Sequence, residues 1–277
     1  MERVNHKLRQ RGYGARDKEE LKRKIILLHD EGYSQVEIAL RWNKEHPFFI
    51  TRMPGEAGKL KSKKYTYIEN YFEAIDTPNK AYILGFILGD GTIIDRIKSK
   101  RLIISVAIQD QSLIKAIAKE LNATDLIKIR SARAVNEQEK VALTINSTKM
   151  CNDLIQLGVL PNKTGKEKWI NLENIDLQWA FLRGFFDADG HIRVYFRNEY
   201  LKVRVGFTVS YLMLTAILGF LKSQQIGLNV NSIASKQGCY DIYLSSISDI
   251  LQIKKFLYQN GELRLARKYD KFSSLMI

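Results

Sequence analysis

The sequence predicts an α+β protein of two similar halves, preceded by a small helical unit. A short motif recurs 99 residues apart, as ILGFILGDG at 83–91 and LRGFFDADG at 182–190. After each copy come strand-like segments and then amphipathic helices, so the halves share one plan. We therefore expect an N-terminal unit at 1–50, a linker at 51–76, a first half at 77–176 and a second half at 177–277.

The strands of the two halves are predicted from period-2 alternation. One apolar face in the first half consists of Leu102, Ile104, Val106 and Ile108, and at an offset of 101 the second half has Val203, Val205, Phe207 and Val209. Such alternation marks strands with one buried and one wet face. The remaining expected strands lie at 126–133, 140–146, 229–235 and 239–245, and the expected closing helices at 149–158 and 248–261.

Composition favours an anionic partner. The chain has 277 residues, is 45% apolar and carries a formal net charge of +14, which suits a folded protein that binds nucleic acid or an acidic membrane. The longest apolar run, at 81–89, is too short to cross a bilayer. We therefore expect no membrane segment and favour nucleic acid.

The cysteines and the N-terminus indicate a reducing compartment. Cys151 and Cys239 are far apart and form no CxxC pair, and the four histidines lack metal-ligand spacing. The N-terminus has no apolar signal-peptide core. We expect a cytoplasmic or organellar-matrix protein that is not secreted.

The N-terminal unit is a helix-turn-helix candidate. Residues 16–45 give a helix, a Gly-containing turn and a helix, with Ser34 and Glu37 forming a capping box at the second helix. DNA binding and an ordinary helical pair both fit this pattern. The Gly- and Lys-rich stretch 54–64 is typical of an exposed linker.

Each motif occupies the end of a helix with a small-residue face. Thr77 and Pro78 predict the start of the first helix, and Asp176 is the expected cap of the second. Small residues recur four apart in both helices, as Gly85 with Gly89 and Gly184 with Ala188. Helices that pair on such faces approach closely, which would make Asp90 and Asp189 neighbours at two C-termini.

Two adjacent carboxylates at helix C-termini repel each other and the helix dipoles. A divalent cation would compensate, and oxygen ligands fit magnesium. Metals held there against substrate phosphates can activate water and stabilise the leaving oxygen. An Asp-Gly turn into a hairpin is the structural alternative. Two copies at one repeat offset favour the metal site.

The paired motifs resemble those of the LAGLIDADG homing endonucleases in their single-chain, two-motif form. The resemblance covers residues 66–277. It implies two halves related by a pseudo-twofold axis that meet through the motif helices, each laying a saddle-shaped antiparallel sheet in the DNA major groove. It also implies a monomer that uses magnesium to cut both strands of a long, nearly asymmetric double-stranded target, leaving short 3′ overhangs.

The same resemblance implies roles for individual residues. Asp90 and Asp189 match the metal-binding acids, and the carbonyls of Gly89 and Ala188 match positions that face metal. The implied catalytic residues are Asp90, Asp189, Gln109, Lys163 and Lys268. Gln109 would order solvent near the phosphate, and Ser210 is its counterpart in the second half. Each lysine would neutralise phosphate or activate water. Leu88 departs from the pattern, because the second motif has Asp187 at that place.

The wet strand faces supply the expected DNA contacts. Long basic and aromatic side chains alternate there with residues expected to face the core, namely Ile127, Ile129, Ile192, Val194 and Phe196. The expected contact residues are Lys98, Lys100, Arg101, Lys128, Arg130, Arg193, Tyr195, Arg197, Lys202 and Arg204.

Two other functions remain open alongside a site-specific DNA endonuclease. One is a non-catalytic transcription regulator on the same fold. The other is a maturase, an RNA-binding cofactor of intron splicing, with intron RNA as its partner. Loss of the motif acids would favour a regulator, and both acids are present.

Overall fold

The computed structural model describes residues 23–24, 26–28, 30–31, 33, 67–97, 99–131 and 138–275. The chain divides into two compact units, residues 1–65 and 66–277. In the first unit, the described positions 23–24, 26–28 and 30 are helical. Most of the helix-turn-helix candidate and residues 51–66 of the predicted linker lie outside the described residues, whereas residues 67–76 of that linker belong to the second unit. In the part of the chain that is described, no helix has the length and apolarity to span a membrane.

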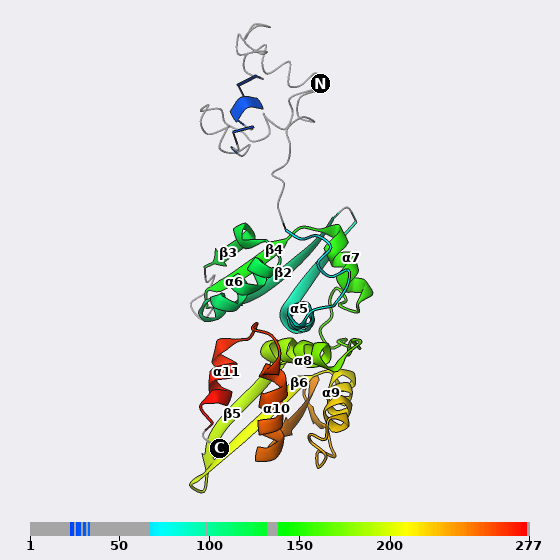
Figure 1. The fold of residues 1–277 in the computed structure, drawn as a ribbon, viewed down its shortest axis with the longest axis vertical. Helices are drawn as coiled ribbons and strands as arrows, with labels where there is room; N and C mark the ends of the chain where they lie inside the picture. Colours follow the sequence, from blue (N-terminus) through cyan, green and yellow to red (C-terminus); the bar gives the residue numbers. More distant parts are fainter. Residues whose placement is uncertain are drawn as a thin grey trace. The chain divides into compact units, whose positions relative to one another are not determined.

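The first half of the second unit is a four-stranded antiparallel sheet with helices (Figure 1). The strand order is β1-β2-β4-β3, and both α6 and α7 contact β2. Its elements are α5 (Pro78–Asp90), β1 (Gly91–Arg96), β2 (Ser99–Ala107), α6 (Gln111–Glu120), β3 (Ile127–Arg130), β4 (Lys140–Ile145) and α7 (Thr148–Gln156), with short 3₁₀ turns at Ile108–Asp110 and Thr124–Leu126.

The second half repeats this plan with the strand order β5-β6-β8-β7. Its elements are α8 (Ile175–Asp189), β5 (Gly190–Arg197), β6 (Tyr200–Val209), α9 (Tyr211–Ser223), β7 (Ala234–Lys236), β8 (Cys239–Leu244), α10 (Ile247–Gln259) and α11 (Ala266–Ser273). The expected α+β class with two similar halves is confirmed. Helix α11 was not expected from the sequence and is the main addition to the repeat.

Both motif helices begin at side-chain caps and end at an aspartate. The Thr77 hydroxyl accepts from the Lys80 amide and Pro78 opens α5, as expected. Helix α8 is capped by Asn174, whose side chain accepts from the Leu177 amide, so the expectation that Asp176 caps it was wrong. Asp176 lies two residues further on, in the first helical turn, where its negative charge still interacts favourably with the helix dipole.

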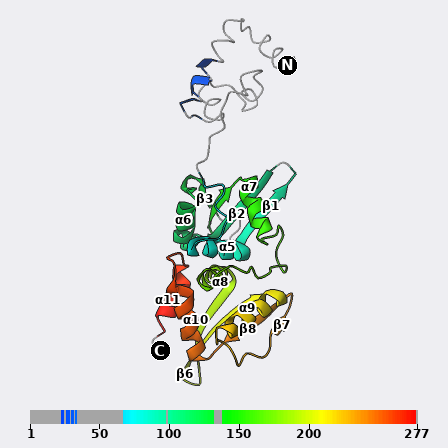
Figure 2. The same ribbon diagram turned by 45° about the vertical axis from the view of Figure 1, so that its right-hand side comes forward.

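The small-residue faces of α5 and α8 meet, as the motif spacing predicted. Figures 1 and 2 show the two helices side by side between the halves. A methyl group built on Gly85 would lie 2.0 Å from the Phe181 carbonyl oxygen, and one on Gly184 would lie 1.9 Å from the Tyr82 carbonyl oxygen. The two backbones therefore touch at a distance that only glycine permits on both sides.

The predicted apolar faces of β2 and β6 are buried at 102, 104 and 106 and at 203, 205, 207 and 209. The expectation that Val194, Phe196 and Ile129 face the core was wrong, because they are 44%, 74% and 62% exposed. Alternation fixes which face of the sheet a side chain takes. Burial also needs another part of the chain to pack over that face, and these three side chains are left uncovered.

The pairing register corrects the expected alignment of the two halves. Gly91 lies opposite Ile104 in the first hairpin, whereas Gly190 lies opposite Phe207 in the second. The second hairpin is therefore four residues longer, and the offset between equivalent residues of β2 and β6 is 103, not 101. Asn198 and Glu199 close it with φ of 49° and 64°, the left-handed values of a two-residue hairpin turn.

We predict that Gly184→Ala destabilises the protein by about 3 kcal/mol or prevents folding, because the added methyl group meets helix backbone. Gly219→Ala is the matched control. Gly219 also lies within a helix, α9, but its added methyl group would meet no described atom within 4 Å. That change should stabilise by about 0.5–1 kcal/mol. Thermal melting monitored by circular dichroism compares them, and equal effects would contradict the backbone contact.

Candidate active site and nucleic-acid interface

The two motif carboxylates lie together where α5 and α8 end. A methyl group on Gly89 would lie 2.3 Å from the Ala188 methyl and 3.0 Å from an Asp189 carboxylate oxygen, so the helix ends are in contact. Burial and then the negative charge of Asp90 raise the pKa of Asp189 to about 6. Burial also raises the pKa of Asp90. The site thus holds two like charges in a partly dehydrated place.

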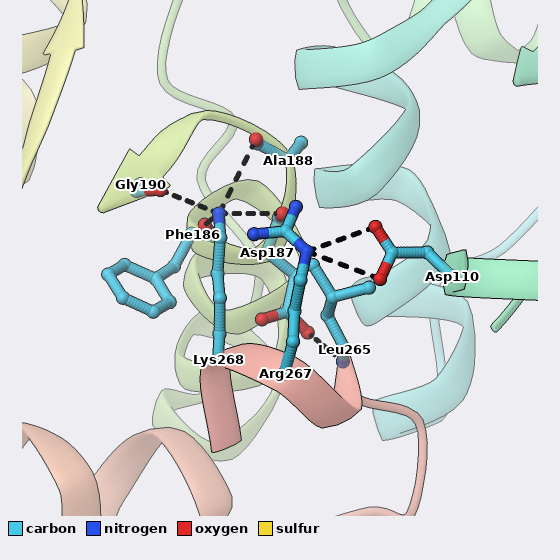
Figure 3. A network of polar contacts seen from close by, with 8 residues as sticks. All are labelled: Asp110, Phe186, Asp187, Ala188, Gly190, Leu265, Arg267 and Lys268. Carbon is cyan, nitrogen blue, oxygen red and sulfur yellow. Dashed lines mark hydrogen bonds and ion pairs between the residues drawn. The ribbon is translucent and has the colours of Figure 1, made fainter. Parts of the chain in front are cut away.

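The two predicted lysines bind the carbonyl ends of the motif helices. Lys163, in the loop between α7 and α8, donates to the Gly89 carbonyl oxygen. Lys268, in the first turn of α11, donates to the carbonyl oxygens of Phe186, Asp187 and Gly190 at 2.7, 2.8 and 2.6 Å (Figure 3). Helix ends leave such carbonyls without partners, so each lysine completes a C-terminus.

The charges of these lysines act across the helix pair. The largest cationic influence on Asp90 comes from Lys268, which binds the end of α8, and the largest on Asp189 comes from Lys163, which binds the end of α5. Burial lowers the pKa of both lysines, that of Lys268 to about 8. Each carboxylate therefore depends on a residue anchored to the other helix.

Three charged residues near the carboxylates were missed by the sequence analysis. The buried Asp110 accepts from Arg267 Nε at 3.0 and 3.2 Å, an ion pair between the two halves (Figure 3). Glu167 is buried near Asp189, accepts from the Gly165 amide at 3.0 Å and raises the pKa of Asp189. Asp110 and Arg267 directly adjoin the expected residues Gln109 and Lys268, which is the signal that could have found them.

Gln109 and Ser210 do not occupy equivalent places. Gln109 is exposed in the 3₁₀ turn after β2, and Asp110 holds the position just before α6. Ser210 holds the position before α9, where its hydroxyl accepts from the Met213 amide and donates to the Glu167 carbonyl oxygen. The structural counterpart of Ser210 is therefore Asp110, and the role of Gln109 stays a prediction.

Asp187, the acid that the first motif lacks, is a structural residue. It accepts from the Tyr82 hydroxyl of α5 and from the Leu265 amide just before α11, each at 2.7 Å, and burial raises its pKa to about 6. The first-motif equivalent, Leu88, is simply buried. Arg183, fully buried on α8, donates to the Leu257 carbonyl oxygen of α10 at 2.9 Å. These bonds tie the C-terminal segment to the motif helices.

The five expected contact residues of the second sheet share one face. The register pairs Arg193 with Arg204 and Tyr195 with Lys202, and Arg197 follows in the same parity, opposite Tyr200. The Arg204 guanidinium lies 4.3 Å from the Tyr243 ring centroid and 5.4 Å from that of Tyr195. These cation–π contacts stabilise the position of the half-buried arginine on this face.

The first sheet matches the expectation in part. Arg101, Lys128 and Arg130 share one face by register. Lys100 lies on the opposite face, in parity with buried Leu102, and forms an ion pair with Asp95, so the shared sheet face does not support it as a DNA contact. The strand residue next to Arg101 necessarily points the other way. Lys98 lies outside the described residues.

The site suits a metal ion that prefers oxygen ligands and takes only a few of them from the protein. Among the described residues no cluster of three or more His, Cys, Asp or Glu side chains could hold a metal ion. A cation between Asp90 and Asp189 would therefore take its other ligands from water and substrate, which is usual for magnesium. The Gly89 carbonyl binds Lys163, and the Ala188 carbonyl lies 3.5 Å from Lys268 Nζ. Metal ligation by these two carbonyls stays a prediction.

The paired helices, the two sheets and the adjacent carboxylates form the arrangement that the two motifs predicted. Residues 176–257 match the family model of the LAGLIDADG-like domain. The fold is similar to that of the LAGLIDADG meganuclease I-AabMI bound to uncleaved DNA, at 15% identity and a TM-score of 0.51, covering 72% of this chain and 90% of that one. A point mutant of I-SmaMI gives 12% identity and a TM-score of 0.51 over 71% of this chain and 89% of that one.

A curated protein is similar in sequence over part of this chain. The ribonucleoside-diphosphate reductase NrdEB subunit alpha of Bacillus subtilis (strain 168) is 24% identical over 183 residues, which is 60% of this chain and 17% of that protein. The chain therefore spans only a small part of that relative. The second half matches the family model of the LAGLIDADG-like domain, and the resemblance read from the two motifs is confirmed.

We predict opposite effects for neighbouring residues of β6. Arg204→Ala should weaken DNA binding by about tenfold or more and barely change the melting temperature, because its side chain lies on the wet face. Val205→Ala should leave DNA binding intact and cost about 1–3 kcal/mol of stability, because Val205 is fully buried. Filter binding and thermal melting test both changes. If Arg204→Ala lowers the stability and Val205→Ala weakens DNA binding, the two sheet faces have been assigned the wrong way round.

We predict a pH-dependent gain in stability from Asp189→Asn. A carboxyl group whose pKa is higher in the folded state favours folding at low pH, and this contribution is lost as the pH rises through about 6. The variant should therefore melt higher than wild type at pH 7.5 in chelator, by roughly 2–4 °C or more. Near pH 4 the two should be similar. Thermal melting at both pH values measures the difference, and a gain of the same size at pH 4 would contradict this cause.

Proposed function

We propose that the protein is a site-specific double-strand DNA endonuclease that works as a monomer with a divalent cation, for which magnesium is the best candidate. The observation that carries the proposal is the contact of the two motif helices at their C-termini. It puts two carboxylates side by side, Asp189 half-buried and Asp90 at the surface, and a lysine acts on each of them. Such a set is costly to a fold unless it binds a cation and a phosphate.

The basic sheet faces support double-stranded DNA as the substrate. Arginine, lysine and tyrosine side chains on one face of an antiparallel sheet can bind phosphates and base edges in a major groove. Two halves with different residues on these faces suit a long target without twofold symmetry. The meganuclease I-AabMI, which has the same fold, was solved bound to uncleaved DNA.

The protein's own groups would divide the work at a scissile phosphate. Asp90 and Asp189 would hold the cation, which would supply activation of water and stabilisation of the leaving oxygen. Lys163 and Lys268 already have hydrogen bonds to helix carbonyls, so their ammonium groups are fixed in place beside the carboxylates. A fixed cation can stabilise charge that develops on the phosphate without reorganisation.

The regulator and maturase alternatives have weaker support. Both motif acids are present and lie at helix ends that touch, which a purely DNA-binding role does not require. No observation on the described residues favours RNA. We also propose that residues 1–50 form a second DNA-binding module and that the protein works in a reducing compartment, where Cys151 and Cys239, both free thiols, stay reduced.

We predict that Asp90→Asn and Asp189→Asn each abolish double-strand cleavage and keep metal-independent DNA binding. Each change preserves side-chain shape and removes one of the carboxylate charges that would hold the cation. The measurement is cleavage of a randomised duplex library with magnesium, followed by binding to the selected target. Asp176→Asn, at the other end of α8, is the control and should cut like wild type. Cleavage at near wild-type rates by both motif variants would end the endonuclease proposal.

A further inference from the structure

The two carboxylates have unequal surroundings. Just before each site lysine the chain has Arg267 in the second half and Asn162 in the first. Just before each helix that follows the central strand it has Asp110 in the first half and Ser210 in the second. An ion pair therefore stands on one side of the helix pair where uncharged residues stand on the other.

The ion pair holds Arg267 in place, and Asp110 accepts from only one of the nitrogens of its guanidinium group. Both contacts with the carboxylate come from Nε, at 3.0 and 3.2 Å. A guanidinium has four further N–H groups on its two terminal nitrogens. The Asp110 side chain is only 8% exposed, whereas that of Arg267 is 49% exposed. A buried carboxylate thus orients an arginine whose outer edge reaches solvent.

Arg267 acts on one of the two motif carboxylates in particular. Its charge is among the main influences that lower the pKa of Asp90, together with Lys268 and Lys163. The main influences on Asp189 include Lys163 and Lys268 but add the negative charge of Glu167 instead of an arginine. Figure 3 shows the Arg267 guanidinium beside the Lys268 ammonium group and turned to Asp110. The Asp110 carboxylate opposes these three cations at Asp90, whereas two carboxylates, Asp90 and Glu167, oppose two lysines at Asp189. The balance of charge is therefore more positive around Asp90.

We propose that Arg267, oriented by Asp110, binds the scissile phosphate of the strand that is cut at Asp90, and that the other strand is cut without such a contact. This inference rests on the endonuclease function proposed above. A planar guanidinium binds two phosphate oxygens at once and stabilises the charge that develops on them during hydrolysis. The two strands are then cut in a fixed order, the strand at Asp90 first, and a nicked duplex accumulates between the two steps.

A purely structural ion pair predicts something different. Asp110 and Arg267 are 157 residues apart and join the two halves, so their loss could simply loosen the fold. Loosening would lower the melting temperature and slow both strands together. Loss of a phosphate contact would slow one strand and leave the melting temperature nearly unchanged.

The test is single-turnover cleavage of a target duplex with each strand carrying its own label. Wild type should cut one strand clearly faster. Arg267→Ala should slow that strand on the order of 100-fold and leave the other within about twofold. Arg267→Lys, which keeps the charge and the ion pair, should slow the same strand less. Lys271→Ala, an exposed lysine of α11, is the control and should change neither rate.

The outcomes separate this inference from the endonuclease proposal. No cleavage by wild type on any target overturns the endonuclease function itself. Cleavage by wild type at equal rates on both strands overturns the inference alone. An equal loss on both strands in Arg267→Ala, or no loss, also overturns it. If Arg267→Ala fails to fold, Arg267→Lys decides by the same strand comparison.

Discussion

The contact between the backbones of α5 and α8 is the constraint on which the rest of the molecule depends. Gly85 and Gly184 each lie against a carbonyl of the other helix, at a separation that a single methyl group would prevent. Because the helices touch along their length, their C-termini end together. The position of both carboxylates, and of the two sheets that begin directly after them, follows from this contact.

Holding two like charges side by side in a partly dehydrated site opposes folding, and the structure offsets that cost with cations from distant segments. Lys163 comes from the loop before α8 and Lys268 from α11, and both also satisfy helix-end carbonyls. Asp187 then holds the start of α11 through the Leu265 amide. The C-terminal segment is therefore fixed to the helix pair by hydrogen bonds to both ends of its first turn.

Features of the fold that depend on a local sequence pattern could be predicted from the sequence. The motif repeat and the spacing of Gly85, Gly89, Gly184 and Ala188 predicted the helix pair, and alternation predicted the buried faces of β2 and β6. Alternation failed at Val194, because burial depends on packing partners that are distant in the sequence. The ion pair of Asp110 and Arg267 could not be foreseen for a related reason, since it depends on an unpredicted helix, α11, packing near the other half.

Two halves in one chain can differ where two identical subunits cannot. In a twofold homodimer every residue appears at both sites, so an arginine near one carboxylate would stand near the other as well. Here Arg267 corresponds to Asn162, and Asp110 to Ser210, across the pseudo-symmetric plan. The second hairpin is also four residues longer than the first, with Arg197 and Tyr200 paired at its end. The same freedom that allows unequal active sites therefore allows unequal sheet faces, which is what recognition of an asymmetric DNA target requires.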